Sequence, residues 1–222
     1  MNNEHYENAK QMFELAKRIA RKLYKENFLG RKPNNNTTFE ETLAIQIISA
    51  TNLLLAIKEN TDKDNTLVAG ILTRSLIEVT ANINYFVVNK SNEKMQTAFL
   101  ETARTVTEKI YEVKNKKKGV SEPTKWADIS LTKRVTLLNS KEASFLALWI
   151  YLSSFAHSDA GYLGSHVSGI RERLPAIFLS FSCLLFFELA SFLDKGGVIK
   201  GGYGKLLLDS AKEYVKDSEV GG

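Results

Sequence analysis

The sequence has few cysteines, prolines and histidines, and each shortage excludes a class of protein. The chain of 222 residues contains 1 cysteine and 3 prolines. A single thiol cannot form an intrachain disulfide or a zinc site built from several thiolates. So few prolines also disfavour an all-β fold with many tight turns. The composition favours a helical protein of a reducing compartment, and we expect a cytoplasmic location.

Recognised sequence motifs for catalysis and for cofactor binding are missing as well. The chain has no P-loop, no dinucleotide-binding glycine pattern and no Gly-x-Ser-x-Gly nucleophile elbow. The 3 histidines are His5, His157 and His166, and no His-Glu-x-x-His pair occurs. Together with Asp159, the last two are too few for a convincing metal site. We therefore expect no metal and no cofactor. The first residues also lack the basic-then-apolar layout of a signal peptide.

Helical periodicity of apolar residues runs through most of the chain. It predicts an all-α fold, an antiparallel bundle of about six or seven helices. The bundle is expected over residues 1–195, and a glycine-rich joint with a short C-terminal helix over 196–222. The predicted helices are Asn3–Phe28, Thr38–Glu59, Thr66–Lys90, Ser91–Lys118, Leu131–Leu138, a helix that Ser140 opens and that includes Trp149–Asp159, and Leu174–Leu193.

Basic and apolar stretches leave two further interpretations open. Lysines gather on the first predicted helix and again at 114–118, where they suit a solvated face or a helix C-terminus as well as phosphate binding. The net charge of +5 permits a polyanionic partner without requiring one. Leu174–Leu193 is the most apolar stretch and is borderline for a membrane span. We expect it to be a core helix, because the other amphipathic helices need a core to pack against.

Two predicted helices carry polar residues in apolar surroundings. Arg74 and Glu78 are four residues apart on the third helix, so they can pair along it. His157 ends an apolar stretch that begins at Trp149. We predict that the two helices meet and bring arginine, glutamate and histidine into one pocket.

This combination suits cleavage of RNA by attack of its own 2′-hydroxyl. A histidine can transfer the proton near neutral pH, and an arginine can bind the phosphate and stabilise developing charge. Ser153 lies one turn before His157, but a helix interior presents a nucleophile poorly. The competing interpretation is a buried polar network that fixes how the helices pack.

Two short motifs resemble a widespread family of uncharacterised bacterial helical proteins. The first is Arg74-Ser-Leu-Ile-Glu78, followed by Asn82 and Tyr85; the second is Tyr151 with Phe155-Ala-His-Ser-Asp159. The layout is also similar to HEPN-like bundles, which implies a role in phage defence, abortive infection or a toxin–antitoxin system, often as a metal-independent ribonuclease. HEPN ribonucleases typically carry arginine and histidine on one helix. Here Arg74 would supply the arginine from another helix.

The resemblance implies a role for each candidate residue. His157 would be the acid/base, Arg74 the phosphate clamp, Glu78 the group that orients Arg74, and Asp159 the support of His157. The remaining candidates would contact the substrate, and two of them come from the loop after Asp159. They are Tyr85, Tyr151, Ser153, Arg171 and Arg173.

The resemblance also implies partners. These are RNA, a second copy of the chain in a homodimer, and a protein of the same defence system. Two alternatives remain open. One is a non-catalytic helical module for protein binding or oligomerisation, in which the polar residues form a structural network. The other is a small membrane-associated protein that uses Leu174–Leu193, and we regard membrane association as the weaker of the two.

Overall fold

The computed structural model describes residues 3–27, 39–89, 91–99, 127–138, 144–156 and 170–196. Within these ranges the backbone is helical apart from short turns and caps, and it contains no strand. Residues 93–99 are helical, and the other helices are α1 (Asn3–Asn27), α2 (Phe39–Asp62), α3 (Thr66–Val88), α5 (Leu131–Thr136), α6 (Phe145–Ala156) and α8 (Leu174–Lys195), with a 3-10 turn at Ile170–Arg173. The predicted all-α architecture is confirmed for this part of the chain.

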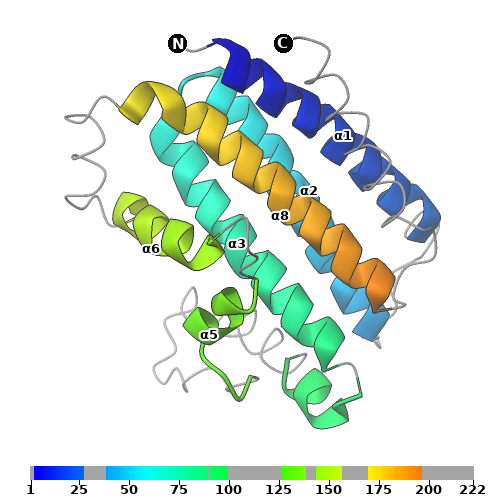
Figure 1. Cartoon of the computed structure of the whole chain (residues 1–222). Helices are drawn as coiled ribbons and strands as arrows, with labels where there is room; N and C mark the ends of the chain where they lie inside the picture. Colours follow the sequence, from blue (N-terminus) through cyan, green and yellow to red (C-terminus); the bar gives the residue numbers. More distant parts are fainter. Residues whose placement is uncertain are drawn as a thin grey trace, which may run out of the picture.

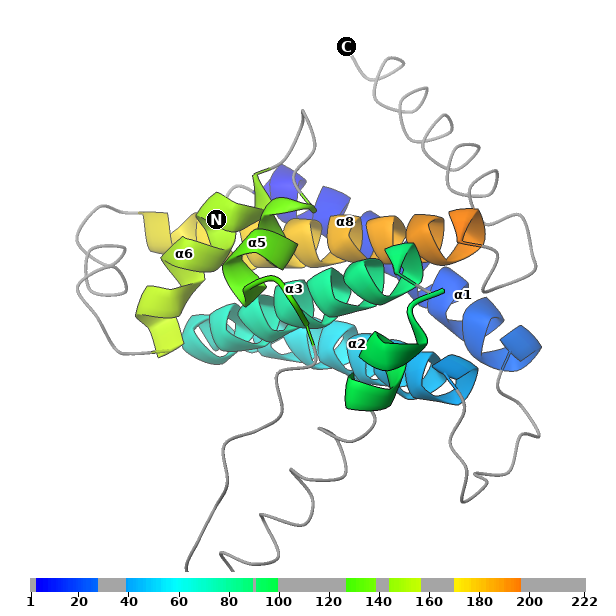
Figure 2. The same ribbon diagram turned by 90° about the horizontal axis from the view of Figure 1, so that it is seen from below.

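Four long helices, α1, α2, α3 and α8, form the main bundle. Helix α8 packs against each of the other three, while α1 packs on α8 and α2. Figure 1 shows α3 and α8 side by side, with α1 on the outer side of α8. Figure 2, seen from below, places α8 over the pair formed by α2 and α3. The smaller helices α5 and α6 pack on α3.

The heptad pattern of α2 explains which side of this helix packs in the bundle. Its repeating apolar positions are all at most 2% exposed, and they are Leu43, Ile47, Ala50, Leu54 and Ile57. A heptad repeat keeps one apolar seam facing a neighbour along the whole helix. Helix α1 buries an equivalent apolar seam, which consists of Ala9, Phe13, Ala16, Ile19 and Ala20. Its other face is basic.

Helix α3 is interior, as its sequence predicts, because it buries residues on several sides. Leu76, Ile77 and Ile83 are fully buried, and so are the hydroxyl residues Thr73 and Thr80. Both threonine hydroxyls donate to carbonyls one turn earlier in α3. Thr73 also lies 3.3 Å from the Ser182 hydroxyl of α8, so a buried polar contact joins the two helices. Hydroxyls can be buried here because each has a partner.

A tight turn joins α2 to α3 and makes them antiparallel. Asp64 has φ of 54°, a left-handed conformation that aspartate tolerates better than most residues. The amide of Asn65 donates to the carbonyl of Asn60 at 2.8 Å, which closes the turn. The turn is at the predicted place, and α2 extends to Asp62 before it.

The prediction of antiparallel neighbours is wrong for α3 and α8. Gly70 of α3 lies against Phe178 of α8, and Thr73 of α3 lies beside Ser182 of α8. Residue numbers therefore increase in the same direction along both helices, which are parallel. Helix α6 is antiparallel to α3 instead, with Phe155 against Gly70 and Trp149 beside Glu78. A short loop makes consecutive helices antiparallel, but α3 and α8 are joined through the long stretch 89–173, which imposes no direction.

Within the described ranges, two helices have the length and hydropathy of a membrane span, namely α3 and the stretch Leu174–Asp194 of α8. Their most apolar windows have mean hydropathies of 1.2 and 2.1, and 50% and 56% of those windows are buried inside the bundle. Core helices of soluble proteins have the same length and composition. The predicted lysine cluster at 114–118 and the joint and helix at 196–222 lie outside the described residues, except for Gly196.

Candidate functional site

The arginine and glutamate predicted to pair on α3 do form an ion pair. The Nε atom of Arg74 lies 3.2 Å from Oε1 of Glu78, and the side chains are 25% and 30% exposed. The pair is therefore at the edge of the bundle and reachable from solvent. The two residues are four positions apart on the helix, which places them on one face.

A tryptophan of α6 contacts both members of this ion pair. The indole N–H of Trp149 donates to Oε1 of Glu78 at 2.9 Å. The guanidinium carbon of Arg74 lies 5.5 Å from the centroid of the Trp149 ring, within range of a cation–π interaction. We call these three residues the α3–α6 cluster. The cluster joins the two helices through the carboxylate of Glu78 and the aromatic ring of Trp149.

The ion pair is close but not aligned as a hydrogen bond. The Nε atom of Arg74 is buried and has no hydrogen-bond acceptor in suitable geometry, although Glu78 is 3.2 Å away. We describe the contact as electrostatic, because a hydrogen bond weakens steeply as its angle departs from linear. Oε1 of Glu78 already accepts the indole N–H. The carboxylate thus orients toward the tryptophan and holds the arginine by charge.

The register of α6 brings Trp149 to this place. Ser144 starts the helix: its hydroxyl accepts the amide of Ala147 at 3.3 Å, and its carbonyl accepts the amide of Leu148 at 3.2 Å. The described helix begins at Phe145, later than the predicted start at Ser140. At its other end Phe155 packs against Gly70, where an added Cβ would lie 2.9 Å from the phenylalanine ring. This close approach fixes α6 along α3.

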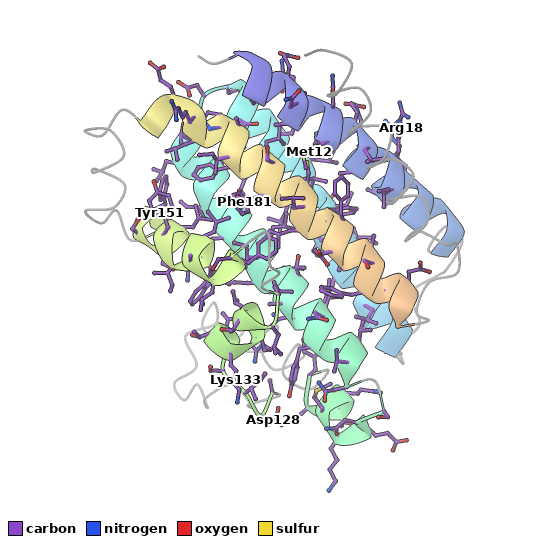
Figure 3. The ribbon with its side chains drawn as sticks, viewed as in Figure 1. Met12, Arg18, Asp128, Lys133, Tyr151 and Phe181 are labelled. Carbon is purple, nitrogen blue, oxygen red and sulfur yellow. The ribbon has the colours of Figure 1, made fainter. Side chains whose placement is uncertain are left out.

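The other candidates on α6 make local contacts. The Ser153 hydroxyl donates to the Trp149 carbonyl at 2.9 Å, which is a bond within its own helix. Tyr151 packs edge-on against Phe155, with ring centroids 5.2 Å apart. Figure 3 shows Tyr151 on α6. Both residues are half-buried and share the helix that bears Trp149.

Tyr85 belongs to a second polar group. Its hydroxyl donates to the carboxylate of Asp128, in the segment that precedes α5. The guanidinium of Arg134 lies 6.0 Å from the Tyr85 ring and donates to Asn82 at 3.0 Å and to the Ile129 carbonyl at 2.7 Å. Burial lowers the pKa of Arg134. Figure 3 shows Asp128 next to α5. Tyr85 therefore helps to dock α5 on α3.

His157 and Asp159 lie outside the described residues, and so does the side chain of Arg171. Arg173 is exposed and directly precedes α8. The predicted meeting of the two polar helices is confirmed for Arg74 and Glu78, which contact α6. The shared pocket with the histidine stays a prediction.

Sequence reasoning missed the residue that links the two helices. Trp149 was identified only as the start of an apolar stretch, although a tryptophan within a helix carries one polar atom that needs a partner when buried. Asp128 and Arg134 were missed as well. Their partners on α3 are 43 and 52 residues away, and no local pattern encodes such a distance.

No group of three or more histidine, cysteine, aspartate or glutamate side chains suited to a metal occurs among the residues whose positions are described. The arrangement that the structure does offer is a partly exposed cation held by a carboxylate and an aromatic ring. Such a cation can bind an anionic ligand.

No protein-family model matches the chain, and comparisons with curated proteins and with solved structures give no match.

Proposed function

We propose that this protein is a HEPN-like defence or toxin protein that cleaves RNA, with Arg74 as its phosphate-binding group. One observation carries the proposal. The Arg74 side chain is 25% exposed and is held at the bundle edge by Glu78 and Trp149. A fixed, accessible guanidinium is the group that proteins use to bind phosphodiesters.

In the proposed reaction the RNA supplies its own nucleophile. The 2′-hydroxyl attacks the adjacent phosphorus, a 2′,3′-cyclic phosphate forms, and the bond to the 5′-oxygen breaks. The imidazole of His157 takes the proton of the 2′-hydroxyl, the 5′-oxygen takes a proton from water, and the imidazolium returns its proton to the hydroxide that remains. Arg74 stabilises the charge that develops on the phosphate oxygens. Glu78 holds the guanidinium and Asp159 orients the imidazole.

The experiment compares purified variants on labelled cellular RNA in the presence of EDTA. We expect Arg74→Ala and His157→Ala to lose about 100-fold or more in cleavage rate, the range typical of general acid–base groups. Arg18→Ala is the matched control, because Arg18 is an exposed arginine on the outer helix α1. His5→Ala is the control for the histidine, because His5 belongs to α1 and not to the proposed site.

Two results contradict the proposal. One is a wild-type protein that does not cleave the RNA pool, or does so only when a metal is added. The other is an unchanged rate in Arg74→Ala while its circular dichroism and melting temperature match those of the wild type. Induction of each variant in bacterial cells gives an independent measurement, since a toxic ribonuclease slows growth and its inactive variants do not.

The second candidate is a non-catalytic helical module for protein binding or oligomerisation. The observation in its favour is that Glu78 and Tyr85 both hold elements together, one through Trp149 and the other through Asp128. Under this proposal Arg74→Ala and Glu78→Gln lower the melting temperature and alter no reaction. The homodimer and the cytoplasmic location belong to the first proposal, and sedimentation of the purified protein tests the dimer.

A further inference from the structure

The ion pair on α3 would not by itself hold the arginine in one place. A solvent-accessible pair four residues apart on a helix is weak, because both side chains lose rotamer freedom when they meet. The Arg74 and Glu78 side chains are 25% and 30% exposed, so water competes for both charges. A third group is needed if the guanidinium is to keep a single orientation.

Trp149 supplies two restraints that act on different parts of the pair. Its indole N–H, 2.9 Å from Oε1 of Glu78, fixes the carboxylate. Its ring, with the centroid 5.5 Å from the guanidinium carbon of Arg74, covers one side of the cation. The tryptophan comes from another helix, so the orientation of the arginine depends on how α6 packs on α3.

We infer that Trp149 is the positioning residue that holds Arg74 ready for a phosphodiester group. The inference rests on the proposed function and adds a residue to its site. Glu78 restrains the Nε edge of the guanidinium and the indole restrains its face, which leaves the two terminal nitrogens to donate to two phosphate oxygens. A bidentate contact of this kind requires a guanidinium whose plane is already set.

A purely structural role for Trp149 makes a different prediction. In that case its replacement destabilises the packing of α6 on α3 and affects binding only through unfolding. The effects of replacing Arg74 and Trp149 would then be independent and would add. If Trp149 acts through Arg74, its replacement has no effect once the arginine is gone.

The closing experiment is a double-mutant cycle read by binding. The probe is a fluorescently labelled single-stranded 2′-deoxy oligonucleotide, which has phosphodiesters but lacks the hydroxyl that the proposed cleavage needs. We expect Trp149→Phe to weaken binding about tenfold, because the phenyl ring has no N–H for Glu78 and is a weaker cation–π partner. Arg74→Ala and the double variant Arg74→Ala/Trp149→Phe should bind equally weakly. Arg18→Ala, at an exposed position of α1, is the control and should bind as the wild type does, and Trp126→Phe, which replaces the other tryptophan, is prepared for the spectra described next.

A spectroscopic readout separates positioning from folding. The chain has 2 tryptophans, so the indole N–H signals in a nitrogen–proton correlation spectrum are assigned by these same two variants. In the wild type, adding the oligonucleotide should shift the Trp149 indole signal. In Glu78→Gln, the same signal should already have a different chemical shift before the oligonucleotide is added. Melting temperatures recorded beside each titration show that the binding changes are not caused by unfolding.

The outcomes distinguish the inference from the proposed function. Additive losses in the cycle, or a wild-type protein that does not bind the oligonucleotide, overturn the inference. Non-additive losses support it even if no RNA is cleaved, and in that event only the ribonuclease proposal fails. Cleavage that needs Arg74 but is unchanged in Trp149→Phe supports the ribonuclease and removes Trp149 from its site.

Discussion

The single cysteine of the chain is a buried side chain of α8. Cys183 has no exposed surface, and burial raises the pKa of its thiol from 9.0 to about 12. Only the thiolate reacts readily with disulfide and alkylating reagents. Cys183 is therefore an inert core residue in the folded protein.

This burial makes the thiol a reporter of unfolding. We expect a disulfide reagent to react with native protein at least about a thousandfold more slowly than with protein unfolded in urea, since three pKa units separate the two states. The measurement is the rate of thiol labelling as a function of urea. A native protein that reacts as fast as the unfolded one would show that α8 is not packed as described.

A tyrosine joins the start of α1 to the end of α2. The Tyr6 hydroxyl donates to Asp62 at 2.7 Å, and the Thr61 hydroxyl is also near, at 3.4 Å. Burial is the main cause that raises the pKa of Tyr6 to about 12, and the negative charge of Asp62 adds to it. Burial also disfavours the charged form of Asp62, but hydrogen bonds from Lys58 and Tyr6 outweigh it and lower the pKa of that carboxyl.

The raised pKa predicts how stability depends on alkaline pH. Because Tyr6 stays neutral longer in the folded state, its contribution is fully present below pH 10 and is lost as the pH rises toward about 12. We expect the wild type to lose roughly 2 kcal/mol more than Tyr6→Phe over this window. Urea unfolding of both proteins at a series of pH values measures the difference, and parallel curves would contradict it.

At the scale of elements, one glycine allows three helices to approach closely. A Cβ on Gly70 of α3 would lie 2.9 Å from the Phe155 ring of α6 and 3.3 Å from the Phe178 ring of α8. The two rings also pack edge-on against each other, with centroids 5.6 Å apart. Neither aromatic ring can move without disturbing the other.

Gly70→Ala should therefore destabilise the protein even though alanine favours helix. Overpacking costs about 1–3 kcal/mol, and the helix preference returns at most about 1 kcal/mol. We expect a net loss of about 1–2 kcal/mol in the free energy of unfolding, measured in urea. Ser75→Ala, at a half-buried position of the same helix, is the control and should change little. A stabilised Gly70→Ala variant would mean that α6 lies further from α3.

Sequence periodicity predicted the elements better than their arrangement. The heptad of α2 and the stretch Leu174–Leu193 became buried helices because one apolar face is a local property. Helix directions depend on which faces meet, and α8 proved parallel to α3 rather than antiparallel. The start of α6 differed too, because Ser144 caps it and Ser140 was chosen on the same chemical grounds.

The candidate site was predictable only as far as local spacing reaches. Arg74 and Glu78 were found because a pair four residues apart shares a helix face. Trp149 is 71 residues from Glu78, and nothing in the sequence states which turn of α6 meets which turn of α3. The prediction that His157 joins them depended on that same register and stays a prediction.

At the scale of the whole molecule, the bundle gives α8 neighbours along its length. It packs against α1, α2 and α3, and its fully buried residues include Phe178, Leu185 and Leu189. Leu184, next to the buried Leu185, is 38% exposed. A helix with this alternation faces protein on one side and its outer surroundings on the other, and the nature of those surroundings is testable.

Two adjacent substitutions distinguish water from lipid around α8. If Leu184 faces water, Leu184→Lys leaves the protein soluble and changes the free energy of unfolding by less than about 1 kcal/mol. Leu185→Lys buries an unpaired charge in the core and should yield aggregated or unfolded protein. In a membrane, lysine at Leu184 would cost about 2.5–3.5 kcal/mol as well, and the wild type would need detergent for extraction. Detergent-free fractionation and melting of the wild type and the two variants decide between these cases. Only if α8 faces water should Leu184→Lys be tolerated while Leu185→Lys is not.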